Sequence, residues 1–297
     1  MNTTRAIGGV LLALLAAGCG SGTGPKTTSQ TAPMTGQIVF QSTRPGSPPE
    51  LLVMDPDGSN LKTLLGGPVT YQSPAFSPDG SRIAFSSNRD GDFSLYVMNR
   101  DGSGVTRVTG PGTSDDSPSW SPDGSKLVFT RSFSFGAALM VVNVDGTGET
   151  ALTPVVTSGY LDWPAWSPDG TKIAYTGGGT PHIYVMNADG SGAMALPALA
   201  SDTVDHPAWS PDGARLAVHD LGRGIVVMNA DGSNPVSLEP GGEYGTEPAW
   251  APDGASVVFT KFYPGSPRIA RIKADGTGEV ELTTGIGAVD GHPSWSH

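Results

Sequence analysis

Acidic and imidazole side chains recur in this sequence just before a proline that itself recurs along the chain. The residue directly before this proline is, in chain order, Ser73, Ser117, Trp163, His206, Glu247 and His292. The residue before that is Gln72, Asp116, Asp162, Asp205, Thr246 and Gly291. Converging carboxylates attract cations, and histidine is a common metal ligand. These two positions are also where the repeats agree least, so they are the first candidates for a functional site.

Two interpretations of this set remain open from the residues alone. The side chains could form an acidic ring that binds a divalent cation or a cationic group of a peptide, with Asp115 and Asp290 joining it from one residue further out. They could instead cap strand ends and bind water, because Asp and Ser are ordinary turn residues. Acid–base chemistry at Asp116, Asp162, Asp205, His206 and Glu247 would need carboxylates that face each other across a substrate-sized gap.

The proline belongs to a motif of the form "PAWSPDG", which divides the chain into repeats. The prolines are Pro74, Pro118, Pro164, Pro207, Pro248 and Pro293, which lie 41 to 46 residues apart. This period is typical of the four-stranded blade of a β-propeller. The position of the candidate residues therefore depends on the strands of each blade, and the repeat pattern predicts the order of those strands.

Each repeat contains four strand-like segments separated by turns. The "PAW" segment ends in a Pro-Asp-Gly turn, and a β-branched segment such as "LVFTR" from Leu127 follows. A variable loop leads to a third segment such as "IYVMN", and an Asp-Gly turn leads to a short polar segment such as "VTRVT" from Val105. A polar last strand suits an exposed sheet edge.

The two ends of the repeat region complete one another. Residues 36–67 contain the second, third and fourth segments of a blade without the first, and "PSW" from Pro293 is a first segment without the others. Five continuous blades and one shared blade predict an all-β, six-bladed propeller over residues 36–297. Closing the ring in this way removes the open sheet edges. If the first segment is the innermost strand, the candidate residues lie at the mouth of the central channel.

The repeats resemble the TolB-type, WD40-like (PD40) propeller repeats of bacterial envelope proteins. The resemblance implies a six-bladed propeller that acts as a protein-binding or scaffold module in the cell envelope. TolB itself has an α/β domain before its propeller, and this chain has a short tether there. Similar repeats precede the hydrolase domain of prolyl-oligopeptidase-like enzymes. The alternative is therefore a propeller enzyme, of lyase or hydrolase type, or a carbohydrate- or metal-binding protein.

The N-terminus predicts export. Arg5 is followed by an apolar run from Ala6 to Ala17, which is typical of a signal peptide and too short to span a membrane. Cys19, the only cysteine, follows "LAAG" and resembles the lipidated cysteine of bacterial lipoproteins, although Ala16 stands where that motif usually has Leu. An ordinary signal peptide with an incidental cysteine is the alternative. We expect a signal peptide over residues 1–18, a lipidated tether over 19–35, and a periplasmic or outer-surface location.

Composition narrows the function classes. The net charge is −11 and there is no basic run, so nucleic acid is not an expected partner. No Gly-x-Ser-x-Gly motif stands between a strand and a helix, and no phosphate loop or sequence-local Cys/His metal motif is present. We therefore expect a monomeric, non-enzymatic protein that binds an envelope protein or peptide, with the membrane contacted through the lipid anchor. No cofactor is expected, and a divalent cation in the channel is the alternative.

The aromatic residues divide into two groups. Trp120, Trp166, Trp209, Trp250 and Trp295, with Phe76, occupy one register and are predicted to pack between blades, as is the series Met54, Met98, Met186 and Met228. Trp163 lies outside that register, at the channel mouth. Loops such as "NRDGDF" from Asn88, "RSFSFGA" from Arg131 and "KFYPGSP" from Lys261 carry aromatics that either contact partners or are covered by neighbouring loops.

Overall fold

The computed structural model describes residues 34–197, 199, 203–239, 245–263, 266–284 and 288–296. The predicted signal peptide (1–18), the predicted lipidation site Cys19 and the tether up to residue 33 lie outside the described residues. In the part that is described, no helix is long and apolar enough to cross a membrane.

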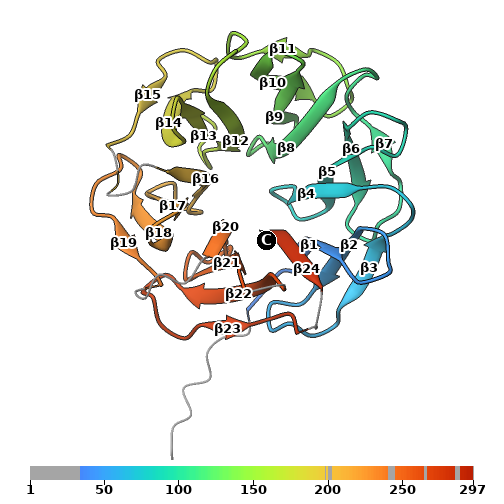
Figure 1. Ribbon diagram of the computed structural model, residues 1–297, viewed down its shortest axis with the longest axis vertical. Coiled ribbons are helices and arrows are strands. Elements are labelled where there is room, and N and C mark those ends of the chain that lie inside the picture. Colours follow the sequence, from blue (N-terminus) through green and yellow to red (C-terminus); the bar gives the residue numbers. More distant parts are fainter. Residues whose placement is uncertain are drawn as a thin grey trace, which may run out of the picture. The chain divides into compact units, whose positions relative to one another are not determined.

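Twenty-four strands make up the described fold. In chain order they are β1 (Ile38–Thr43), β2 (Glu50–Met54), β3 (Lys62–Leu65), β4 (Tyr71–Phe76), β5 (Arg82–Ser87), β6 (Ser94–Asn99), β7 (Thr106–Arg107), β8 (Ser114–Trp120), β9 (Lys126–Phe133), β10 (Gly136–Asn143), β11 (Thr150–Ala151), β12 (Tyr160–Trp166), β13 (Lys172–Gly178), β14 (His182–Asn187), β15 (Met194–Ala195), β16 (Val204–Trp209), β17 (Arg215–Asp220), β18 (Gly224–Asn229), β19 (Val236–Ser237), β20 (Gly245–Trp250), β21 (Ser256–Lys261), β22 (Arg268–Lys273), β23 (Val280–Glu281) and β24 (Val289–Trp295). They form six antiparallel four-stranded sheets, arranged as blades around a central axis with β4, β8, β12, β16, β20 and β24 innermost (Figure 1). The predicted six-bladed propeller is confirmed.

The ring closes through the pairing of its two ends. Strand β24 pairs with β1, with Ile38 opposite Trp295 and Val39 opposite Ser294, and the sheet order is β24-β1-β2-β3. In Figure 1 the red strand β24 lies beside the blue strand β1. The predicted shared blade is therefore confirmed.

Packing between blades follows the predicted register. Trp120 is 6% exposed, and its indole Nε1 donates to the carbonyl of Ala75 in the preceding blade over 3.0 Å. Trp209 and Trp250 make the same inter-blade bond to Ala165 and Ala208. The four methionines of the series are at most 2% exposed. Each blade therefore buries its apolar face against the next one.

The hairpin after Arg131 differs from the loop that the sequence predicts. Strands β9 and β10 continue into "RSFSFGA", where Phe133 pairs with Gly136. Gly136 has a φ of 153°, and a Cβ there would lie 2.2 Å from the carbonyl oxygen of Val156. Glycine thus lets the hairpin run beside residues 156–157 to a tight turn. The outermost strands are also shorter than predicted: apart from β3, each has two residues.

Candidate functional site

Each innermost strand carries a β-bulge at the candidate position. In the blade of β4, Gln72 pairs with Ser86 and Ala75 with Ala84, so Ser73 and Pro74 together oppose one residue of β5. The register shifts at the equivalent place in the other five blades. Proline suits a bulge because it has no N–H to give to the ladder. A bulge re-aims side chains, here in all six blades.

The bulge residue has a left-handed backbone in every blade. The φ angles of Ser73, Ser117, Trp163, His206, Glu247 and His292 lie between 49° and 56°. This region is disfavoured for residues other than glycine and costs on the order of 1 kcal/mol per residue. Strain of this kind is concentrated at functional sites in proteins. The six residues are called the bulge ring below.

The bulge ring lines a cavity on the axis of the propeller. The cavity has a volume of about 540 Å³ and is lined along its length by the innermost strands and the Ser-Pro-Asp-Gly turns of the blades. All six bulge-ring residues contribute to its wall, as do the five packing tryptophans and Phe76. Its size is that of a ligand-binding pocket.

Two of the candidate aspartates stabilise the bulges. Asp116 accepts a hydrogen bond from the backbone N–H of Ser117 (2.7 Å), and Asp162 accepts one from Trp163 (2.8 Å). Asp116 also accepts from the side-chain amide of Gln72 in the neighbouring blade. Burial raises the pKa of Asp116 and the charge of Asp162 adds to the rise, while bonds from Ser117 and Ser73 oppose it. The strand-capping interpretation is thus supported for these two residues.

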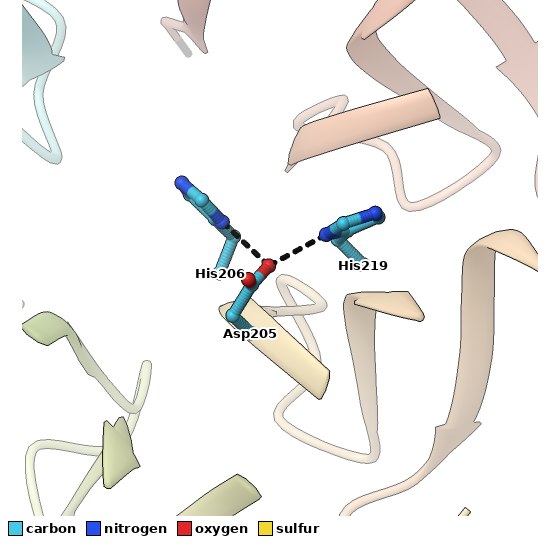
Figure 2. A group of neighbouring side chains, drawn as sticks. All are labelled: Asp205, His206 and His219. Atoms are coloured by element: carbon cyan, nitrogen blue, oxygen red, sulfur yellow. Dashed lines mark hydrogen bonds and ion pairs between the residues drawn. The ribbon is translucent and has the colours of Figure 1, made fainter. Parts of the chain in front are cut away.

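Asp205 is bound by two imidazoles. The Nδ1 atoms of His206 and His219 each lie 2.7 Å from the same oxygen, Oδ1. Figure 2 shows the two rings approaching this carboxylate from different sides, with the second nitrogen of His206 pointing away from it. Burial works against the charge, but the hydrogen bonds from His206 and His219 hold the pKa of Asp205 well below its usual value.

Glu247 and His292 form a second pair, between neighbouring blades. Nε2 of His292 lies 3.1 Å from Oε1 of Glu247, and the backbone N–H of His292 donates to Oε2 over 2.7 Å. In two other blades, the residue before the bulge residue is an aspartate, Asp116 or Asp162, that accepts a hydrogen bond from the N–H of the bulge residue. In the blade of His292 that residue is Gly291, and Glu247 of the neighbouring blade accepts the bond instead. Burial opposes ionisation, yet the charges of His292 and His206 and the hydroxyl of Thr260 keep the pKa of Glu247 low.

The rings of Trp163 and His206 join these groups in the wall of the axial cavity. Trp163 stacks on His206, with ring centroids 3.8 Å apart and planes at 27° to each other. The ring centroids of His206 and His292 are 6.2 Å apart. Trp163 is therefore partly buried against its neighbour. Donor atoms of His206, Glu247 and His292 lie within 4.8 Å of one another, and so do those of Asp205, His206 and His219. Both sets could hold a metal ion.

The two outlying aspartates lie apart from the bulge ring. Asp115 is fully buried and forms an ion pair with Arg131, with 2.7 Å between its Oδ1 and Nε. Arg131 also binds Glu149, so this network is structural. Asp290 lines a second cavity, beside Arg44 and Phe40. The structure thus gives neither residue a place in the wall of the axial cavity.

His219 is the one member of the cluster that the sequence reasoning missed. It lies on β17 directly opposite Asp205. The residues at the same place in the other blades are Ser86, Thr130, Thr176, Thr260 and Gln41. A comparison of the repeats at the second strand, rather than only at the first, would have singled it out.

Some aromatic side chains of the three loops are exposed, whereas Phe93 and Tyr263 are half-buried. Phe133 and Phe135 are 39% and 63% exposed and stack on each other, with centroids 6.0 Å apart. Phe262 is 50% exposed. These loops are therefore not covered by their neighbours at these residues.

Comparison with known proteins agrees with the repeat pattern. The family described as the TolB beta propeller domain matches residues 18–202 and 137–297. No curated protein matches the chain. Among solved structures, TolB from Acinetobacter baumannii superposes with a TM-score of 0.78 at 22% identity, covering 90% of this chain and 68% of that one.

Two further solved structures share the fold. The nidogen/laminin complex matches with a TM-score of 0.69 at 15% identity, covering 86% of this chain and 98% of the other. An oligogalacturonate lyase in complex with manganese matches with a TM-score of 0.52 at 20% identity, covering 85% and 74%. At these identities the likeness extends to the fold alone, because one fold serves many functions.

Proposed function

The chain belongs to the TolB beta propeller family, and from this premise we propose that it is a binding module of the bacterial cell envelope. Its axial cavity takes a segment of a partner protein or peptide, and the rigid ring acts as a scaffold. Export to the periplasm or outer surface, with an anchor at Cys19, belongs to the same proposal.

The observation that carries the proposal is the bulge ring. Six strained residues, one from each blade, present their side chains to one cavity of about 540 Å³. The packing positions are regular from blade to blade, whereas the ring contains hydroxyl, indole, imidazole and carboxylate groups. Variation at a strained position that lines a cavity of a rigid scaffold is expected when that position makes specific contacts.

The chemistry of the ring favours a peptide segment with polar or cationic groups. Trp163 and His206 offer a stacked aromatic surface, and Glu247 lies in the same wall. Aromatic anchors in a concave site supply much of the binding energy of protein interfaces, and the nearby carboxylates select the charge of the ligand.

Site-specific photo-crosslinking in intact cells tests the proposal. A photoreactive residue at position 163 should capture one protein reproducibly. The control is position 194 on β15 of the same blade, where Met194 is 70% exposed on the rim. The same capture pattern from both positions, or none from position 163, would refute a partner at the mouth.

A propeller enzyme is the second candidate, favoured by one observation. Imidazole and carboxylate groups of three blades, those of His206, Glu247 and His292, converge at the mouth. A lyase or hydrolase acting on a carbohydrate could use such groups. Incubation of the purified chain with acidic polysaccharides, followed by an assay for new reducing ends, distinguishes this candidate. Turnover that is abolished by Glu247→Gln would support the enzyme. No turnover of any of the polysaccharides would favour the binding module.

A further inference from the structure

We propose that His206, Glu247 and His292 bind a divalent transition-metal ion of the zinc class at the mouth of the axial cavity. The three residues come from β16, β20 and β24, three neighbouring blades, and each stands at the bulge position of its strand. The proposal goes beyond the binding of a partner and does not depend on it.

Distances within the cluster suit one small cation. Nε2 of His292 and Oε1 of Glu247 are 3.1 Å apart, and one donor atom of each of the three residues lies within 4.8 Å of the others. Bonds of about 2.0–2.2 Å to a tetrahedral ion place its ligands roughly 3.3 Å from one another. The pair of His292 and Glu247 is close to that separation already, and the donor atom of His206, which lies within 4.8 Å of both, would have to approach them by at most about 1.5 Å.

His206 is oriented as a metal ligand. Its Nδ1 lies 2.7 Å from the carboxylate of Asp205, which accepts a hydrogen, so in the neutral ring that a metal requires the proton belongs on Nδ1 and the lone pair on Nε2. That Nε2 is buried, and none of the described residues forms a hydrogen bond with it. A buried acceptor without a partner is costly and calls for an explanation. A carboxylate behind an imidazole is the usual outer support of a metal-bound histidine.

Packing and backbone hold the ligands in place. Trp163 stacks on the His206 ring at 3.8 Å, and Glu247 accepts from the hydroxyl of Thr260 over 2.6 Å. The strained bulges fix where each side chain leaves the backbone. Such preorganisation lowers the cost of assembling a site.

The neighbouring set of Asp205, His206 and His219 is a weaker candidate for the same ion. Its contacts of 2.7 Å are hydrogen bonds between a carboxylate and two Nδ1 donors. A metal there would have to displace both bonds, whereas at the proposed site it replaces one, the contact of His292 Nε2 with Glu247 Oε1. We therefore assign Asp205 and His219 to the outer shell of the site, where Asp205 orients the His206 ring and His219 bonds Asp205.

The donor set also selects the class of metal. Two imidazole nitrogens and one carboxylate suit zinc and the late first-row metals, whereas calcium takes six to eight oxygens. Three protein ligands leave one position of a tetrahedral ion open. Because all three residues line the axial cavity, that position would face a bound water or a donor atom of a ligand in the cavity.

Titration calorimetry with Zn²⁺ tests the site on the full chain, purified without a histidine tag and stripped with a chelator. We expect one ion per chain, bound at least about 100-fold more tightly than Ca²⁺. His206→Gln, Glu247→Gln and His292→Ala should each weaken binding by about 100-fold or more, and Asp205→Asn by about 10- to 100-fold, as for outer supports of other sites.

The matched control is His182→Ala, which removes a half-buried histidine on β14 whose ring bonds only to Thr180 among the described residues. It should leave Zn²⁺ affinity unchanged. Thermal unfolding of each variant without metal checks that it is folded. As a second readout, Co²⁺ bound to the wild type should give the intense visible absorption of a tetrahedral ion, and His292→Ala should lose it.

The proposal is overturned if Zn²⁺ binds equally well to His206→Gln or His292→Ala while these variants stay folded. A preference for Ca²⁺ over Zn²⁺ would overturn it too. Neither result bears on photo-crosslinking at position 163, which needs no metal, so the two proposals fail separately.

Discussion

At the scale of single residues, the bulge ring concentrates both strain and variation. Its six members share one backbone conformation and differ in chemistry. Some of them are linked to one another: Trp163 stacks on His206, and Glu247 binds His292. Ser117 is the simplest member, because its hydroxyl is buried and no described residue bonds it.

We expect Ser117→Gly to stabilise the protein. Glycine adopts the φ of 54° without strain, and the change also removes a buried hydroxyl without a partner. The gain should be about 0.5–1 kcal/mol, or about 2 °C in melting temperature for a domain of this size. Thermal unfolding followed by circular dichroism measures it. Ser114→Gly, in the same strand without a positive φ, is the control and should lower the melting temperature.

At the scale of elements, the Ser-Pro-Asp-Gly turns hold the innermost strands to their neighbours. Asp123 accepts hydrogen bonds from the hydroxyl of Ser121 (2.6 Å) and from the N–H of Ser125 (3.0 Å). These bonds, that of Ser121 first, lower the pKa of Asp123 to about 2. A carboxyl whose pKa is lower in the folded state stabilises the fold above its unfolded pKa of about 3.9 and loses that effect as the pH falls.

Replacing Asp123 by Ala should therefore destabilise the protein in a pH-dependent way. At pH 7 the melting temperature should fall by about 2 °C or more, as for the loss of a cap of about 1 kcal/mol. The difference from the wild type should shrink as the pH drops from about 4 towards 2. Melting curves at several pH values check this. An equal difference at pH 7 and pH 3 would mean that ionised Asp123 does not stabilise the turn.

Strands and turns were predictable where the same residues recur at the same place in each blade. The "PAW" and "SPDG" strings predicted the innermost strand, its turn and the packing tryptophans, because these depend on local conformation and burial. The bulge was signalled by a proline inside each strand but was not predicted. His219 was not predicted because the repeats were compared only at the first strand, whereas its role comes from cross-strand pairing with Asp205.

At the scale of the whole molecule, the pairing of β24 with β1 closes the six blades into a ring. Trp295 is 7% exposed and packs with Ile38, Phe40 and Leu52 of the N-terminal strands. Its indole also donates to the carbonyl of Thr35. The last strand thus joins residues that are more than 250 positions apart.

Deleting residues 292–297 should destabilise the whole ring. The change removes most of the inner strand of the shared blade and the buried Trp295, whose loss alone is expected to cost about 3–5 kcal/mol. The melting temperature should fall by more than about 10 °C, or cooperative unfolding should be lost. Calorimetry of the truncated chain provides the measurement. A transition as sharp and as high as that of the full chain would contradict closure by β24.

Closure was predictable from the sequence, because an orphan first segment at one end complements the orphan segments at the other. It was not predictable which of the polar residues at the mouth stabilise the bulges and which remain free to bind a ligand. Asp116 and Asp162 resemble members of an acidic ring in the sequence, yet each is used by the N–H of its own bulge. Only the fold shows which polar groups are already satisfied and which, such as Nε2 of His206, are not.

The central claim is that the mouth of the axial cavity contributes more to the affinity for the partner than the exposed loop aromatics do. Its most direct test is the affinity of the protein captured through position 163, measured by titration calorimetry for the wild type, Trp163→Ala and Phe135→Ala. We predict that Trp163→Ala weakens binding by about 30-fold or more, as at an interface hot spot, and that Phe135→Ala changes it less than about twofold. Loss of affinity in Phe135→Ala with no change in Trp163→Ala would contradict the account.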